Sequence, residues 1–239
     1  MNGPAESADA STPRLAARGT PTAAWRRPTR GEHRWPSVGV ICAAIVLQLL
    51  LPDLLVLHPR WLLPGVETTL LIALIVANPV RLVRAHPVLR LGGLGLVAAM
   101  TVANAGSAVL LIERLLTGRT GGLATSLLGS GAAIYVTNII AFGLWYWELD
   151  RGGPVERAQG NRQHTDFLFP QMTQPDVAPP DWEPSFLDYL YVSYTNATAF
   201  SPTDTMPLSR WAKLLMLGQS AIALTTIALV IARAVNILR

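Results

Sequence analysis

Side chains that carry oxygen ligands crowd the segment YTNATAFSPTDTMP, residues 194–207, which lies just before the last hydrophobic run of the chain. Hydroxyl and amide oxygens can replace part of the water around a cation, and rings of carboxylates attract cations to the mouth of a pore. The segment therefore predicts a pore-lining or filter-like site. Its candidate residues are Thr195, Asn196, Thr198, Ser201, Pro202, Thr203 and Asp204.

The same segment also fits a plain structural role. Ser201-Pro202-Thr203-Asp204 reads as a turn, because proline suits the second turn position and aspartate caps helices. The threonines could hydrogen-bond to neighbouring helices. Asn196-Ala197-Thr198 matches a glycosylation sequon, for which chance is the simplest explanation in a membrane-embedded helix.

The composition places these residues in a membrane protein. Hydrophobic residues make up 51% of the 239 positions and charged residues only 14%, against about 25% charged in soluble domains. Residues 91–112, 123–147 and 214–232 form apolar runs near the ~20 residues that span a bilayer. Two weaker runs are 38–57, interrupted by Pro52 and Asp53, and 62–78, which carries Glu67 and should end before Pro79. We expect an all-α protein with about five transmembrane helices in the cell membrane.

The distribution of basic residues predicts how the chain crosses the membrane. Residues 1–37 read as a disordered basic tail, residues 38–122 as N-terminal membrane helices, and residues 123–239 as a C-terminal unit. With five spans, one side holds six Lys and Arg of the tail, three of residues 79–90 and five of 148–213, and the other side holds five. This bias predicts a cytoplasmic N-terminus.

Polar residues inside the apolar runs are further candidates, because ionisable groups are costly in a membrane. They are Asp53, Glu67 and Asn138, and Asn104, Asn138 and Gln219 are candidates for interhelical hydrogen bonding. Glu148 and Asp150 read as a solvated helix end, and Phe167–Phe169 as a segment that dips into the headgroup region. No metal-ligand spacing, nucleophile–base set or phosphate loop is present in the sequence, which predicts neither an enzyme nor a cofactor. The net charge of +4 comes from topology-determining arginines and indicates no nucleic-acid partner.

The order of segments after residue 123 resembles the pore module of the potassium-channel superfamily: outer helix, pore helix, filter strand and inner helix. The matching residues are Asp188, Leu190 and Tyr191 at the start of the pore helix, Thr198 near its end, Asp204 and Pro207 after the filter, and Lys213 before the inner helix. This resemblance implies a re-entrant, pore-like helix before the last span. The chain also resembles a family of bacterial integral membrane proteins without an established activity, which carry the phrases LWYWELDRGGP, DFLFPQM and TNATAFSPTDTMPL.

The filter position departs from the channel pattern. Ala199-Phe200-Ser201-Pro202-Thr203 stands where such channels have TVGYG, and a carbonyl ladder depends on glycines that are missing here. Pro202 also fixes φ and removes an N–H group. The sequence thus predicts a homo-oligomer that passes monovalent cations without selectivity; the alternative is a non-conducting structural or accessory membrane protein. The arginine count places residues 148–213 inside the cell, which would make the pore loop inverted relative to potassium channels.

Overall fold

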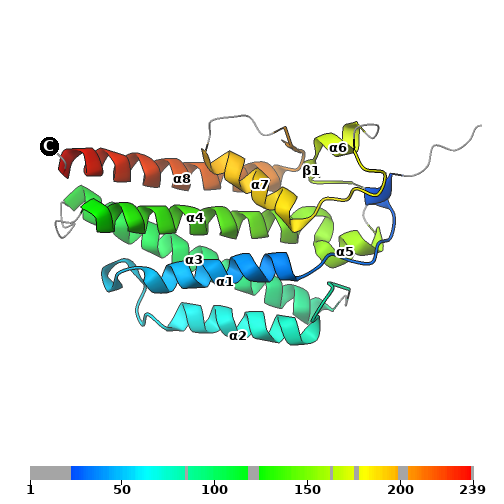
Figure 1. Cartoon of the computed structure of the whole chain (residues 1–239), viewed down its shortest axis with the longest axis horizontal. Helices are drawn as coiled ribbons and strands as arrows, with labels where there is room; N and C mark the ends of the chain where they lie inside the picture. The colour runs from blue at the N-terminus through cyan, green and yellow to red at the C-terminus, as the bar shows by residue number, and fades with distance from the viewer. Residues whose placement is uncertain are drawn as a thin grey trace, which may run out of the picture.

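The computed structural model describes residues 23–83, 86–117, 124–161, 164–174, 178–198 and 204–237. The fold is mostly helical, and its five long helices lie side by side along the long axis of the molecule (Figure 1). They are α1 (Trp35–Leu50), α2 (Leu62–Ala77), α3 (Pro87–Thr117), α4 (Ala124–Leu149) and α8 (Arg210–Ile237).

Three segments are long and apolar enough to cross a membrane. They are Pro87–Thr117, Leu128–Gln159 and Arg210–Ala232, which agree with the three uninterrupted runs of the sequence. The helices α1 and α2 have 16 residues each, or about 24 Å at 1.5 Å per residue, slightly less than a bilayer core. The prediction of a mostly helical protein is therefore confirmed, and three of its helices are long and apolar enough to cross a membrane; a total of five spans remains a prediction.

Prolines set the ends of the two shorter helices. Pro52 follows Leu51, whose backbone is extended at φ −65° and ψ 144°, so α1 ends at Leu50. The expected run over 38–57 is thus helical only in its first part, and the short 3₁₀ helix η2 (Asp53–Leu55) follows the break. Pro79 similarly follows the end of α2 at Ala77, as the sequence predicts.

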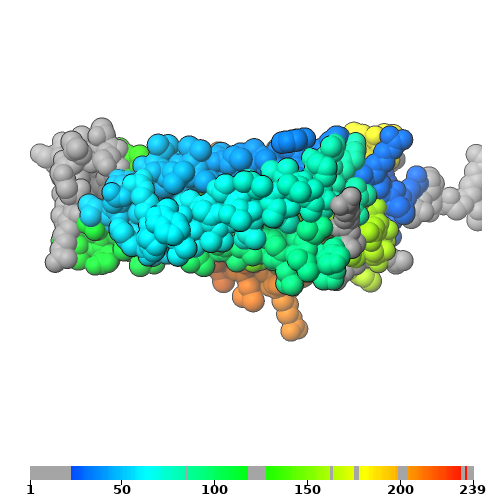
Figure 2. Space-filling view, turned by 90° about the horizontal axis from the view of Figure 1, so that it is seen from below, coloured from blue at the N-terminus to red at the C-terminus, as the bar shows by residue number. Residues whose placement is uncertain are grey.

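The central helix of the bundle is α4, which packs against α1, α3, α8 and the shorter α7 (Phe186–Thr198). The helix α2 is peripheral and packs on α3 and α1. Figure 2 shows this outer face, with α2 in front of its two neighbours. The core between these helices is built mainly from aliphatic and aromatic side chains, among them Leu96, Met100, Leu144, Tyr146 and Tyr189.

Short elements cover one end of the bundle, which we call the covered end. They are η1 (Ala24–Arg26), η3 (Asp150–Gly152), α5 (Pro154–Gln159), α6 (Pro170–Thr173), and the antiparallel pair β1 (Phe167–Leu168) and β2 (Met206–Pro207). The chain reverses sharply after α4, with positive φ at Arg151 (51°), Gly152 (87°) and Gly153 (100°). Glycine reaches this left-handed region without a steric penalty, so two of the three positions are well suited to the reversal.

Two parts of the chain differ from the sequence-based expectation at this end. The sequence predicts a disordered tail over residues 23–34, yet this described part folds back on the bundle and buries Trp25 to 8% exposure. Residues 1–22 lie outside the described residues. Phe167 and Phe169 do not reach into the headgroup region as expected, because they are buried against the rings of Tyr146, Tyr189 and Trp182. Their apolar rings complete the protein core.

Candidate functional site

The start of α7 is fixed at the covered end of the bundle. The N–H and hydroxyl groups of Ser185 donate to the Asp188 carboxylate at 2.7 and 2.8 Å, which caps the first turn. The backbone N–H of Phe186 donates to Glu32, and the hydroxyl of Tyr189 donates to Asp150 at 2.5 Å. These contacts join α7 to the N-terminal segment and to the end of α4.

The other end of α7 lies halfway along the bundle. The Ser193 hydroxyl donates to the carbonyl of Ile139, which is ten residues before the end of α4. Asn196 donates to the side chain of Gln219 at 2.8 Å, and Gln219 is nine residues after the start of α8. At 1.5 Å per residue, these ten and nine residues of helix correspond to about 14–15 Å, close to half the thickness of a bilayer core.

The chain after α7 returns to the end where α7 began. Met206 and Pro207 of β2 pair with Leu168 and Phe167 of β1, and the N–H of Leu208 donates to the Asp166 carbonyl at 2.8 Å. Asp166 in turn donates its N–H to Asp150 at the end of α4. The helix α7 therefore runs from the covered end to the middle of the bundle, and β2 lies again at the covered end (Figure 1).

A buried polar cluster holds the inner end of α7 in place, and we call Tyr146, Ser193, Asn196 and Gln219 the Gln219 cluster. The Gln219 side-chain oxygen accepts hydrogen bonds from Tyr146 at 2.6 Å and from Asn196 at 2.8 Å. The Gln219 amide nitrogen donates to the carbonyl and to the hydroxyl of Ser193 at 2.9 and 2.7 Å. Tyr146, Ser193 and Gln219 are all fully buried. The predicted interhelical role of Gln219 is thus confirmed.

The seven filter-like residues are not gathered into one site in the described part of the chain. Thr195 and Thr198 donate to carbonyls of their own helix at 3.0–3.1 Å, and Asn196 points to α8. Asp204 is exposed and lies two residues before β2, at the covered end. Ser201, Pro202 and Thr203 lie outside the described residues.

The three polar candidates in the apolar runs have different surroundings. Asp53 is exposed and forms an ion pair with Arg60 at 2.5 Å. Asn138 is buried, and neither polar atom of its side chain has a hydrogen-bond partner among the described residues. Glu67 is fully buried in α2. Gln48 of α1 is its polar neighbour, although no hydrogen bond of ordinary geometry joins the two side chains.

A charged cluster at the covered end was not expected from the sequence, and we call Glu32, Asp150, Arg151, Arg157 and Tyr189 the end cluster. Asp150 has no exposed surface, and its carboxylate accepts hydrogen bonds from the Tyr189 hydroxyl at 2.5 Å and from the Asp166 N–H group at 2.8 Å. The Arg157 guanidinium donates to the Trp147 and Asp150 carbonyls at 2.6 and 3.0 Å and lies over the Tyr189 ring. The prediction of a solvated helix end at Asp150 is therefore wrong.

The electrostatics of the end cluster follow from its burial. Burial raises the pKa of Glu32 above its ordinary value, while the Arg157 guanidinium and the N–H groups of Trp147 and Phe186 lower it. Arg157 lies 3.8 Å from Glu32, and Arg151 lies 3.5 Å from Asp150. Glu32 and Tyr189 come to this cluster from distant parts of the chain, so local spacing gave no sign of their contacts with Arg157 and Asp150. The phrase ELDRGGP, with charges beside two glycines directly after an apolar run, was the available signal.

The polar side chains of the Gln219 cluster and the end cluster serve as structural hydrogen-bond partners rather than as reactive groups. Among the described residues, no group of three or more His, Cys, Asp and Glu side chains could hold a metal ion. Searches of family models, of curated proteins and of solved structures found no match to this chain. The functional conclusion therefore rests on the geometry of the chain itself.

Proposed function

We propose that this chain is a multi-pass protein of the cell membrane, with α1, α2, α3, α4 and α8 as spans and α7 as a re-entrant half-helix. The depth of about 15 Å reached by Ser193 and Asn196 supports this topology, because it equals half a bilayer core. The pairing of β2 with β1, at the end of the bundle where α7 begins, supports a return of the chain to the side from which it came. The arginine bias favours the cytoplasm for that side.

We infer that the unit formed by α4, α7 and α8 is non-conducting and serves a structural or accessory role. The observation that carries this inference is the Gln219 cluster, in which the amide and hydroxyl groups of α7 and α8 bond to one another. A pore needs such groups to face water or ions. The exposed side of α8 is instead mostly apolar and suits lipid or another helix; its large members are Leu214, Leu217, Leu224, Ile227 and Ile231.

A non-selective cation pathway in a homo-oligomer is the second candidate. One observation favours it: the half-helix packs between two long helices and is followed by a return segment, as in the pore modules that the sequence resembles. Asp204 is exposed after this return, where copies of the chain could bring several carboxylates together.

Conductance measurements separate these two candidates. We expect wild-type protein, reconstituted into planar bilayers at high protein loading, to give no current above that of protein-free bilayers. Asp204→Asn should behave identically, and Asp181→Asn provides a control in another exposed carboxylate. A cation current that falls in Asp204→Asn and persists in Asp181→Asn would reject the non-conducting role and support the second candidate.

Cysteine labelling tests the topology independently of conduction. In a Cys42→Ala background, Gln159→Cys and Leu208→Cys place thiols at exposed positions before and after the α7 excursion, whereas Leu54→Cys lies at the opposite end of α1. A membrane-impermeant maleimide should label the first two from the cytoplasmic side and the third from the outside. Labelling of Gln159→Cys and Leu208→Cys from different sides would exclude a re-entrant α7.

A further inference from the structure

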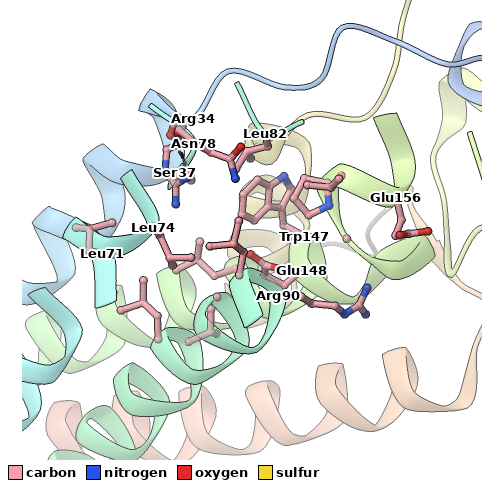
Figure 3. A pocket seen from close by; sticks show the side chains of 18 of the residues that line it. Arg34, Ser37, Leu71, Leu74, Asn78, Leu82, Arg90, Trp147, Glu148 and Glu156 are labelled. Carbon is pink, nitrogen blue, oxygen red and sulfur yellow. Dashed lines mark hydrogen bonds between the residues drawn. The ribbon is translucent and has the colours of Figure 1, made fainter. Parts of the chain in front are cut away.

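A cavity of about 290 Å³ opens near the covered end, between α1, α2, α3 and α4 and beside α5. Figure 3 shows Arg34 directly before α1, Ser37 from α1, Leu71 and Leu74 from α2, and Trp147 and Glu148 from α4 around this space. Its volume is at the lower end of the range for small-molecule sites, which are usually mostly apolar with a few placed polar groups. This cavity is separate from the Gln219 cluster, so its occupancy does not depend on whether α7 lines a pore.

The lining changes from polar to apolar along the axis of the bundle. Its polar members include Arg34, Ser37, Asn78, His86, Arg90, Glu148 and Glu156, and its deeper apolar members include Ile41, Leu71, Leu74, Val97 and Leu144. Ile41 of α1 follows Arg34 by seven residues, and on α3, Val97 follows Arg90 by the same number. Seven residues correspond to about 10 Å of helix. The charged part therefore lies toward the covered end and the apolar part lies toward the middle of the bundle.

The Glu148 carboxylate faces this cavity without a hydrogen bond or ion pair among the described residues. It lies against α3, where a Cβ atom at Gly93 would be only 2.9 Å from its Oε1 atom, so the missing side chain of glycine makes room for it. Arg34, Arg90 and Arg157 surround it and act on it electrostatically from outside ion-pair distance. A desolvated carboxylate in this position favours a ligand that brings a cation or a hydrogen-bond donor.

The two arginines of the cavity retain donors for an anion. One terminal nitrogen of Arg34 donates to the Asn78 carbonyl at 3.1 Å, and the Arg34 Nε atom has no partner among the described residues. One terminal nitrogen of Arg90 donates to the Gly152 carbonyl. Each guanidinium has five N–H donors in a planar fork that suits phosphate oxygens, so most of these donors are free for a ligand.

We propose that this cavity binds a phospholipid whose head carries a phosphate and a protonated primary amine. The buried Arg34 holds the phosphate, Glu148 accepts hydrogen bonds from the ammonium group, and the first part of one acyl chain lies between Ile41, Leu71 and Val97. The phosphate thus meets a positive side chain and the ammonium group meets a negative one. If the long helices span the membrane, the polar-to-apolar direction of the cavity also matches that of a lipid in the surrounding leaflet.

Native mass spectrometry of the delipidated full-length protein tests the proposal. Titration with phosphatidylethanolamine should give one tightly bound lipid per chain, with at least about tenfold weaker binding of phosphatidylglycerol, which has the phosphate but lacks the amine. Soluble phosphoethanolamine, which lacks the chains, should not bind in the same concentration range. Equal binding of the two lipids would overturn the role of Glu148. Binding of soluble phosphoethanolamine as tight as that of the lipid would overturn the lipid assignment.

Two variants locate the binding within the molecule. Glu148→Gln should remove the tenfold preference for the amine, whereas Glu113→Gln, an exposed carboxylate toward the other end of α3, should retain it. Val97→Phe fills the apolar part of the cavity and should weaken both lipids. Its thermal unfolding in detergent shows whether the variant is folded. A folded Val97→Phe protein that binds phosphatidylethanolamine as tightly as wild type would reject this cavity as the site.

Discussion

Buried polar side chains have opposite surroundings in two regions of this bundle. In the Gln219 cluster, where α4, α7 and α8 meet, Gln219 makes four hydrogen bonds, and Tyr146 and Ser193 are each bonded to it. In the pair of α1 and α2, Gln48 and Glu67 are buried, yet none of their side-chain polar atoms has a hydrogen-bond partner in the described structure. The same types of group therefore stabilise the first region and reduce the stability of the second.

Substitutions in the two regions should accordingly change the free energy of unfolding in opposite directions. Loss of a bonded group in the first region leaves its partners buried and unsatisfied, which lowers the free energy of unfolding. Loss of an unbonded carboxylate in the second region removes a desolvation penalty and leaves no partner behind. Unfolding in detergent, followed by helical circular dichroism, provides a common measure.

The largest effect is expected at Asp150, which anchors the outer end of α7. Asp150→Ala removes the acceptor for Tyr189 and Asp166 and leaves Arg151 buried without its nearby carboxylate. We expect a loss of about 3–5 kcal/mol in the free energy of unfolding, as for other broken buried charge pairs. Asp181→Ala, in an exposed carboxylate, should change it by less than about 0.5 kcal/mol. Equal stability of the two variants would mean that the end cluster does not hold α7.

The next largest effect is expected at Gln219. Gln219→Leu preserves most of the side-chain volume but leaves the Tyr146 hydroxyl and Asn196 amide without their acceptor, at a cost of about 1–3 kcal/mol. Thr225→Val, on the exposed side of α8, should cost almost nothing. In a double-mutant cycle, Ser193→Ala should cost less in the Gln219→Leu background than in the wild type, because its contact with Gln219 is already lost and only its bond to the Ile139 carbonyl remains. Full additivity would indicate independent sites and contradict a single cluster.

The helices were largely predictable from the sequence, whereas the partners of the buried charges were not. Long apolar runs and Pro79 identify α3, α4, α8 and the end of α2, since these signals act within one or two helical turns. The apolar run over 38–57 continues past Pro52, and the interruption that Pro52 and Asp53 predict agrees with the end of α1 at Leu50. Hydrophobicity alone carries no information on where a helix is interrupted.

The hydrogen-bond partners of the candidate-site residues could not be predicted from the sequence either. The oxygen-rich residues near Asn196 stand out in the sequence, but only the fold decides that Asn196 faces Gln219 and that the threonines bond to their own helix. Glu32 and Phe186 are 154 positions apart, and Asp150 and Tyr189 are 39 apart. Contacts over such separations follow from how the helices pack, and a single sequence contains no direct record of them.

In the second region, a substitution at Glu67 should stabilise the protein. Glu67→Met has a similar volume and removes a fully buried carboxyl group that has no hydrogen-bond partner among the described residues. We expect the free energy of unfolding to rise by about 1 kcal/mol or more. Glu113→Met removes a carboxylate from the exposed surface of α3 and serves as the control. A destabilised Glu67→Met protein would show that Glu67 does have a favourable partner, and the contrast between the two regions would disappear.

The smallest expected effect is the pH dependence of stability that comes from Glu32. Its carboxylate accepts a hydrogen bond from the backbone of Phe186 at the start of α7. Because burial raises the pKa of Glu32 above its ordinary value of 4.5, the folded protein holds this proton at pH values where the unfolded chain has lost it. Its contribution to the free energy of unfolding is thus fully present below pH 4.5 and decreases as the pH rises through the folded-state pKa. Glu32→Gln keeps one carbonyl oxygen, which can accept from either Trp147 or Phe186, and it should flatten the decrease in stability above pH 4.5. Glu113→Gln should retain the wild-type slope, and an unchanged slope in Glu32→Gln would assign the pH dependence to other groups.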